Sequence, residues 1–222
     1  LDVLQEVCRQ YRLPLVEDAA ESLGAFYDGA HTGTIGRLGV LSFNGNKTIT
    51  TGGGGAILTD DDDLADEAKH LTTVAKQDHE WEYFHDKTGY NYRLPNLNAA
   101  LGCAQLEELP SFLDRKRALA ERYRDAFSGV DGVSFFAERE DTRSNYWLNV
   151  LLLDDDAADR RDAVLEATNE AGLMTRPTWQ LLPSLPMYED CPRMDLSTAE
   201  SLERRLINIP STPSLVNDAQ ER

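Results

Sequence analysis

Hydrophobic positions near the start of the chain recur at helical spacing and then give way to short apolar runs. The helical spacing is seen in Leu1, Leu4, Val7, Cys8 and Tyr11. Residues 13–20 have the pattern of a buried strand that ends in acidic residues, and residues 38–43 form a second apolar run. The pattern predicts a helix followed by two strands, with Asp18 at the carboxyl end of the first strand.

The second half of the chain shows strands alternating with helices. Residues 95–129 contain two helical patterns in succession, and we expect them to be separated at Pro110 because proline interrupts a helix. Three further elements are predicted: a strand over residues 148–153, a helix over residues 157–171 that ends at Gly172, and a strand over residues 173–175. The alternation after residue 130 indicates a compact second domain of α+β type.

A lysine and four consecutive glycines lie between two apolar runs. The run over residues 38–43 is followed by a polar segment that contains Lys47, and Gly52 to Gly55 precede the next apolar run. This order predicts a strand, an exposed loop and another strand. Four glycines in a row cost more backbone entropy than a plain connection needs, so we expect positive φ angles or a group lying against this backbone.

Two chemistries use a lysine in a glycine-rich loop. A P-loop needs a glycine, four residues and then Gly-Lys-Ser/Thr, but Asn46 precedes Lys47 and Leu41 takes the place of the first glycine. The other chemistry is a lysine that forms a Schiff base with a carbonyl, as with pyridoxal 5'-phosphate (PLP), whose pyridine nitrogen needs a nearby acid. Asp18 is a candidate for that acid, because α/β sheets place ligand contacts at strand ends. The alternative for Lys47 is a solvated loop lysine.

Composition and charge narrow the classes of function. The 222 residues are 41% hydrophobic, which is enough for a core, and their net charge of −17 argues against nucleic acid as a partner. No apolar run approaches the ~18 residues of a membrane span and no leader pattern occurs, so we expect a soluble, cytoplasmic protein without membrane contact. The three cysteines, Cys8, Cys103 and Cys191, lack metal-ligand spacing and suit a reducing compartment.

Four motifs occur in a fixed order along the chain. They are residues 17–24 (EDAAESLG), residues 42–47 (SFNGNK), the glycine run, and residues 89–94 (GYNYRL). Together they resemble the DegT/DnrJ/EryC1/StrS family of PLP-dependent aminotransferases, which act on nucleotide-linked keto sugars, and the resemblance extends through nearly the whole chain. It is greatest to enzymes that aminate C4 of a UDP- or GDP-linked 4-keto-6-deoxy-N-acetylhexosamine. The tail resembles legionaminic-acid and bacillosamine pathway members in particular, at residues 176–179, 186–192 and 206–211.

The resemblance implies an α/β fold, that of the PLP-dependent transferases of fold type I (aspartate aminotransferase-like). Residues 1–110 are then part of the PLP-binding large domain, and residues 111–222 are the C-terminal small domain. In the family the first helix follows a long N-terminal stretch, so we expect the chain to be a fragment. This agrees with a helical pattern that starts at Leu1 without a capping residue, although a chain trimmed at a flexible start is the alternative.

The resemblance also implies roles for individual residues. Lys47 binds the cofactor covalently and shuttles the proton, Asp18 faces the pyridine nitrogen, and Ser42 donates its hydroxyl to the cofactor phosphate. Glu21 stands where many members have glutamine beside the cofactor's 3′ oxygen, so this acid is either protonated or points elsewhere.

Three further residues are implied to bind ligands. Asn91 and Arg93 lie in the motif that reaches across a homodimer to the partner's cofactor phosphate, for which the planar fork of arginine is suited. Arg176 is a candidate for the substrate or donor carboxylate, and the alternative is an arginine that tethers a loop.

The implied function is transfer of an amino group, from glutamate as the expected donor, to C4 of the keto sugar for surface polysaccharide or glycan biosynthesis. Two alternatives stay open. A PLP-dependent sugar dehydratase of similar fold carries histidine in place of the lysine, so Lys47 argues against it. A non-catalytic chain of the same ancestry would fold without holding the cofactor.

Other segments have structural interpretations. Residues 75–94 predict a long loop, either a flap packed by its own aromatics or a subunit interface. Asp60 to Asp63 could mimic a metal site, but an acidic helix start is commoner. Asp28-Gly29 predicts a tight turn between short strands, with His31 as a polar residue flanking it.

We expect the chain as given to bind PLP poorly. A phosphate dianion needs several converging donors, and in the family the N-terminal stretch supplies them together with several strands of the central sheet. Without those strands an apolar sheet edge and face should be exposed, which favours association.

Overall fold

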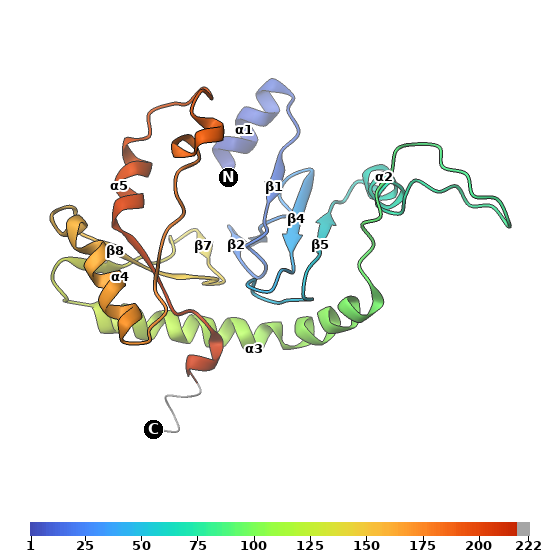
Figure 1. The fold of residues 1–222 in the computed structure, drawn as a ribbon. Helices are drawn as coiled ribbons and strands as arrows, with labels where there is room; N and C mark the ends of the chain where they lie inside the picture. Colours follow the sequence, from blue (N-terminus) through green and yellow to red (C-terminus); the bar gives the residue numbers. More distant parts are fainter. Residues whose placement is uncertain (217–222) are drawn as a thin grey trace. The chain divides into compact units, whose positions relative to one another are not determined.

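The computed structural model describes residues 1–216, and the chain divides into two units (Figure 1). The first unit comprises Leu1–Leu113 and Arg139–Asn145, and the second comprises Asp114–Glu138 and the chain from Tyr146 onwards. Among the described residues, the first unit contains two sheets and the second unit contains one. The short segment Arg139–Asn145 returns to the first unit, although no sequence pattern indicated this.

The sheet that positions the candidate site belongs to the first unit. Its strand order is β1 (Val16–Asp18), β4 (Leu38–Ser42) and β5 (Gly55–Leu58), with β1 and β4 parallel and β5 antiparallel to β4 (Figure 1). Asp18 is paired with Val40, and Ser42 with Gly55. The carboxyl ends of β1 and β4 therefore meet at one edge of the sheet, where Asp18 ends one strand and the lysine loop leaves the next.

The prediction of a buried strand over residues 13–20 is wrong for two of its apolar residues, Leu13 and Val16. Leu13 is 57% exposed and Val16 is 55% exposed, and the burial of β1 alternates so that only its central residue, Glu17, points into the protein. Val40 and Ile57 are also exposed, and they share the face of the sheet on which Val16 and Asp18 lie. The sheet thus presents the exposed apolar face that the sequence led us to expect.

Two helices of the first unit follow the predicted pattern. Helix α1 spans Asp2–Tyr11 and ends at Arg12 in the left-handed conformation. Helix α2 spans Asp62–Thr72, and the side chain of Asp61 caps it by accepting a hydrogen bond from the backbone N–H of Leu64 at 3.1 Å. The acidic cluster over residues 60–63 therefore serves the start of a helix.

A small second sheet brings the returning segment into the first unit. Strand β2 (Phe26–Tyr27) pairs with β3 (Ala30–His31) on one side and with β7 (Thr142–Arg143) on the other, all antiparallel. The predicted turn is confirmed, because Asp28 and Gly29 both have positive φ, 46° and 78°, as a two-residue hairpin turn requires.

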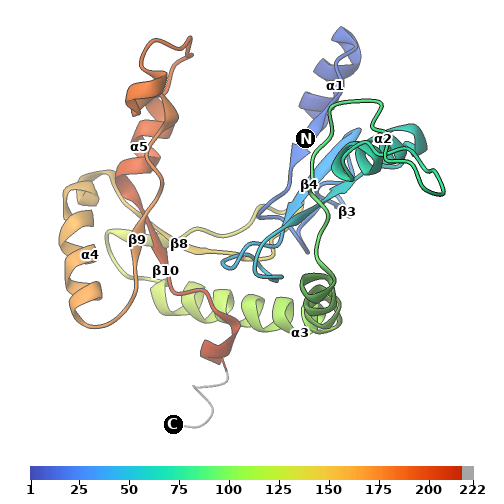
Figure 2. The ribbon, with the colours of Figure 1, turned by 45° about the vertical axis from the view of Figure 1, so that its right-hand side comes forward.

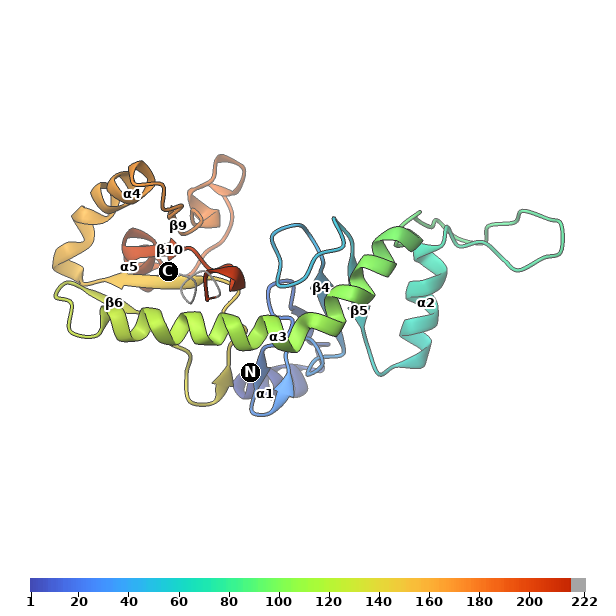
Figure 3. The ribbon, with the colours of Figure 1, turned by 90° about the horizontal axis from the view of Figure 1, so that it is seen from below.

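The predicted long loop is confirmed between α2 and the next helix. It contains only isolated bridges, which pair Thr73 with Asn91 and Lys76 with His85. Figure 3 shows it as an open hairpin that extends away from α2. Its aromatic side chains are exposed, with Trp81 at 72% and Tyr83 at 83%.

Helix α3 spans Asn96–Phe127 without interruption, so the predicted break at Pro110 is wrong. Proline removes one backbone hydrogen bond and costs a helix interior roughly 3 kcal/mol. Burial of α3 residues after the proline, Leu113, Leu119 and Ala120, offsets that cost.

The second unit contains a four-stranded sheet in the order β6 (Val133–Phe135), β8 (Asn149–Leu153), β10 (Leu206–Ile209) and β9 (Arg176–Pro177). All its neighbouring strands are antiparallel. Helices α4 (Arg161–Glu170) and α5 (Ser197–Arg205) belong to the same unit as this sheet (Figure 2). The buried core consists of Leu151, Leu153, Ala157, Ile207 and Ile209.

Two boundaries in this unit differ from the prediction. Residues 155–160 form a 3-10 turn before α4, so the predicted helix begins with a different geometry. The predicted strand over residues 173–175 is wrong, because β9 begins at Arg176. Thr175 is instead buried and bonds to Thr168 and Asn169, which ties the end of α4 to the following chain.

Among residues 1–216, no helix combines the length and the apolar character needed to cross a bilayer.

Candidate active site

The two adjacent acids of β1 do different things. Glu17 is buried, and its carboxylate accepts hydrogen bonds from the backbone N–H groups of Gly33, Ile35 and Gly36 at 2.8, 2.7 and 2.6 Å. Asp18 lies on the opposite face, is exposed, and accepts one bond from the N–H of Ala20 at 3.2 Å. Glu17 therefore holds a neighbouring loop, while the carboxylate of Asp18 is open to a ligand.

The loop that carries Lys47 is anchored at both ends. The N–H of Phe43 donates to the carbonyl of Gly54 at 2.9 Å, and the N–H of Thr51 donates to the carbonyl of Phe43 at 3.0 Å. Ile49 and Thr51 are each only 2% exposed. The side chain of Lys47 is 12% exposed, so the alternative of a solvated loop lysine does not describe it.

The glycine run has the backbone conformation that the sequence predicted. Gly52, Gly53 and Gly54 have φ angles of 79°, 159° and 94°. A Cβ on Gly54 would lie 2.6 Å from Cδ1 of Leu94, and a Cβ on Gly55 would lie 2.4 Å from the carbonyl oxygen of Leu41. Both conformation and close packing therefore require glycine here.

Lys47 and Glu21 form an ion pair in which the Nζ atom donates to the Oε1 atom. The Glu21 side chain is 46% exposed and the Lys47 side chain much less. We expected Glu21 either to be protonated or to point elsewhere, and the structure directs its carboxylate to the lysine. The pair brings together two of the predicted site residues.

Asn145 is a residue that the sequence analysis missed. It is 5% exposed, and its Nδ2 atom donates to the carbonyl oxygens of Glu21 and Leu23 at 2.7 and 3.0 Å and to Oγ1 of Thr48 at 3.3 Å. It thus connects the turn that carries Glu21 to the loop that carries Lys47. No local sequence pattern identifies Asn145, because its contacts are with residues remote in sequence and depend on the pairing of β7 with β2.

Ser42 ends β4 beside this loop. It is partly buried, and its hydroxyl accepts a hydrogen bond from the N–H of Asn44 at 3.3 Å. The hydroxyl hydrogen can still be directed to a ligand at the same edge of the sheet as Asp18.

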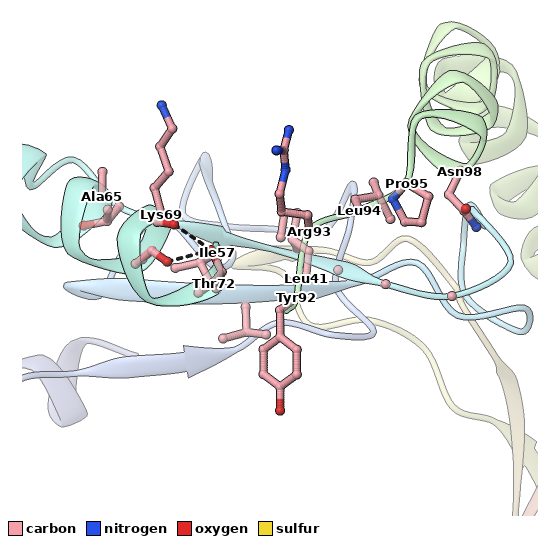
Figure 4. A pocket seen from close by; sticks show the side chains of 17 residues that line it. Leu41, Ile57, Ala65, Lys69, Thr72, Tyr92, Arg93, Leu94, Pro95 and Asn98 are labelled. Atoms are coloured by element: carbon pink, nitrogen blue, oxygen red, sulfur yellow. Dashed lines mark hydrogen bonds between the residues drawn. The ribbon is translucent and has the colours of Figure 1, made fainter. Parts of the chain in front are cut away.

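Asn91 and Arg93 lie where the long loop returns to α2. Asn91 pairs with Thr73, and Arg93 lines an open cavity of about 800 Å³ between β5, α2 and the start of α3. Figure 4 shows the side chains of Arg93 and Lys69 projecting to the same side, while Tyr92 points the opposite way. The loop thus presents exposed cationic and aromatic groups.

Arg176 belongs to the second unit. Its guanidinium donates to Oδ1 of Asn169 and to the carbonyl of Thr175, both at 3.0 Å. These bonds agree with a tether between β9 and α4, and its proposed contact with a carboxylate stays a prediction.

Two minor predictions concern metal and turn residues. Within residues 1–216 no group of three or more His, Cys, Asp or Glu side chains is placed to hold a metal ion.

His31 accepts a hydrogen bond from the N–H of Gly24 at 2.8 Å and packs edge-on against Phe26, so it supports the hairpin.

Comparison with known proteins gives a consistent result. The model of the DegT/DnrJ/EryC1/StrS aminotransferase family matches residues 1–222. A putative pyridoxal phosphate-dependent aminotransferase, EpsN of Bacillus subtilis, is 37% identical over 100% of this chain, and GDP-perosamine synthase of Escherichia coli O157:H7 is 36% identical over 98%. The chain spans 58% of the length of each relative.

A solved structure also matches. The aminotransferase TlmJ of Streptoalloteichus hindustanus superposes with a TM-score of 0.89 at 30% identity, covering 97% of this chain and 58% of the TlmJ chain. The expected α/β fold of this class of aminotransferase is therefore confirmed.

Proposed function

The chain belongs to the DegT/DnrJ/EryC1/StrS aminotransferase family, and we propose that it carries the catalytic lysine of a PLP-dependent enzyme that aminates a nucleotide-linked keto sugar. The observation that carries the proposal is the position of Lys47. It lies in an anchored, glycine-flanked loop that leaves β4 at the edge where Asp18 ends β1.

The donor set at this edge fits the cofactor. Lys47 supplies an amine for the aldehyde, Asp18 an exposed carboxylate for the pyridine nitrogen, and Ser42 a hydroxyl for the phosphate. PLP, when bound, supplies an electron sink that allows an amino group to be exchanged at a carbon atom.

The remaining chemistry falls to the chain's own side chains. The carboxylate of Asp18 provides a negative charge on the exposed face of the sheet, where it can retain a proton on a ring nitrogen. The Nζ atom of Lys47 is the one basic atom we assign to carrying a proton to and from the substrate carbon. Glu21 keeps that atom in a defined place through the ion pair.

The finer assignments are part of the same proposal. We take the acceptor to be a 4-keto-6-deoxy-N-acetylhexosamine and the donor to be glutamate, in cytoplasmic biosynthesis of a surface glycan of the legionaminic-acid or bacillosamine type. The motifs in the tail of the chain support that type, and the name of one relative, GDP-perosamine synthase, supports a GDP-linked sugar. Arg176 is proposed to bind a substrate carboxylate.

A homodimer completes the proposal. Asn91 and Arg93 would contact the phosphate in the partner's site, and the exposed, extended loop that ends with them supports this. The planar guanidinium of arginine can bind two phosphate oxygens at once.

Borohydride reduction in the presence of PLP, followed by peptide mapping, tests the proposal. We expect the label at Lys47. Label spread evenly over Lys69, Lys76, Lys87 and Lys116 would contradict the assignment. Absence of any label at saturating PLP would favour the non-catalytic alternative.

The expectation of weak PLP binding by this chain stays a prediction. The open position of Asp18 and Glu21 on the surface supports it, because a phosphorylated cofactor needs enclosure as well as donors. Titration of the 222-residue chain with PLP, followed by absorbance and sedimentation, measures it. Saturation at micromolar PLP by a well-behaved dimer with transaminase activity would show the expectation to be wrong.

A further inference from the structure

Asn145 holds two segments that are remote from it in sequence. Its Nδ2 atom reaches the carbonyl oxygens of Glu21 and Leu23 in one segment and Oγ1 of Thr48 in the other. Lys47 and Glu21, whose side chains form the ion pair, belong to these two segments. We infer that Asn145 is a positioning residue that fixes the ammonium group of Lys47, an inference that rests on the proposed function of Lys47.

The backbone around Asn145 is itself fixed within the first unit. Two residues earlier, β7 pairs with β2, so that Arg143 lies opposite Phe26 and Thr142 opposite Tyr27. The N–H of Asp28 also donates to the carbonyl of Asp141 at 2.9 Å. The paired strand β7 therefore fixes the position from which the side chain of Asn145 extends.

Burial makes these contacts consequential. Asn145 is 5% exposed, and the two hydrogens of its amide nitrogen serve three acceptors. The three hydrogen bonds are partly buried, so water replaces the lost donor only in part and the segments shift when the amide is removed. The shift acts where Glu21 meets Lys47, because Thr48 directly follows the lysine.

Aspartate, which has nearly the same shape as asparagine, could not replace Asn145. Aspartate has the same outline, but a carboxylate only accepts hydrogen bonds and would face two carbonyl oxygens. Asn145→Asp therefore removes the connection and adds repulsion, while Asn145→Ala removes the connection without adding a charge. Thr48→Val removes only the longest of the three contacts.

The test is competitive labelling of lysines with an amine-reactive reagent in the intact, cofactor-free protein, read by mass spectrometry. We expect Asn145→Ala and Glu21→Gln each to raise the labelling rate of Lys47 about fivefold, as loss of the one hydrogen bond between the Lys47 ammonium group and Glu21 predicts, with no change at Lys87. Lys87 is an internal control because it has its own ion pair with Glu67, at 2.7 Å. Asn208→Ala is a matched control variant, since that amide donates to the carbonyl of Pro177 in the second unit.

A double-mutant cycle separates positioning from general loosening. If Asn145 acts through the ion pair, Glu21→Gln combined with Asn145→Ala should raise the rate little more than either change alone. An unchanged Lys47 rate in folded Asn145→Ala, or an equal rise at every lysine, would overturn the inference. Should Asn145→Ala not fold, Thr48→Val should still raise the Lys47 rate about twofold, and no rise there would also overturn it.

The result is independent of cofactor binding. Failure of Lys47 to take label from saturating PLP and borohydride would refute the proposed function without changing the reactivity of Lys47 in Asn145→Ala. Conversely, specific PLP label at Lys47 with no effect of Asn145→Ala would refute only the positioning role.

Discussion

The ammonium group of Lys116 donates a hydrogen bond to the carbonyl oxygen of Ser211 at 2.8 Å, in a place where the lysine is only 5% exposed. The same group donates to the carbonyl of Trp147 at 3.3 Å. Burial lowers the pKa of Lys116 to about 8, because a charged amine loses its hydration inside the protein.

This pKa makes the stability of the second unit depend on pH. Between pH 8 and the ordinary lysine pKa, the unfolded chain binds a proton that the folded chain does not, so the free energy of unfolding rises with pH. We expect the free energy of unfolding of the wild type to increase by up to about 3 kcal/mol relative to that of Lys116→Met across this pH window. Urea unfolding of both proteins at several pH values measures the difference.

The exposed Lys87 provides the control. Its ion pair with Glu67 raises the pKa of Lys87, so any change in Lys87→Met should be small and of opposite sign. A constant difference between wild type and Lys116→Met over the whole window would contradict the prediction.

Replacement of Glu17 should cost stability without touching the chemistry. Glutamine offers one acceptor oxygen where the carboxylate serves three backbone N–H groups, so Glu17→Gln leaves at least one buried donor unsatisfied. We expect a loss of about 2 kcal/mol in the free energy of unfolding, measured by denaturant titration. Loss of less than about 0.5 kcal/mol would show that the loop over residues 33–36 does not depend on this carboxylate.

Asp18→Asn is expected to reduce activity with little effect on stability, the reverse of Glu17→Gln. The side chain is exposed on the other face of β1, so stability should change by less than about 0.5 kcal/mol. Turnover should fall by about 100-fold or more, as removal of an electrostatic stabiliser usually causes, while PLP still labels Lys47. Steady-state kinetics at saturating PLP, with a keto-sugar nucleotide and glutamate, measure this, and unchanged turnover would reject the role of Asp18.

The sequence was informative wherever the decisive interactions were local. The acidic helix start at residues 60–63, the Asp28-Gly29 turn and the positive φ angles of the glycine run follow from residue types within a few positions of each other. The same reasoning failed at Pro110, because burial of α3 residues after the proline outweighs a local helix breaker. It also failed at residues 173–175, where the bonds of Thr175 to α4 replace strand pairing.

The candidate site shows the same division. The glycine-rich loop and the strand end made Lys47 and Asp18 candidates, and motif resemblance added Glu21. The alternation of β1 explains why Asp18 and Glu17 lie on opposite faces of the sheet. Asn145 could not be found in this way, since it is separated by 97 residues from Thr48 and by 124 from Glu21. Its contacts depend on the pairing of β7 with β2. Strands of two residues are too short to give a recognisable pattern in the sequence.

Gly54→Ala tests how far the lysine loop depends on its glycines. The φ angle of 94° disfavours any side chain, and the new Cβ would lie 2.6 Å from Cδ1 of Leu94, so we expect a loss of about 2 kcal/mol or more in the free energy of unfolding. Gly45→Ala is the control, because a Cβ there meets no atom within 4 Å, and it should cost less than about 1 kcal/mol. The double variant Gly54→Ala, Leu94→Ala should remove the steric part of the loss but retain the backbone part. Equal stability of Gly54→Ala and Gly45→Ala would mean that the loop can adopt another conformation, and the labelling rate of Lys47 in Gly54→Ala would then show whether the lysine moves with it.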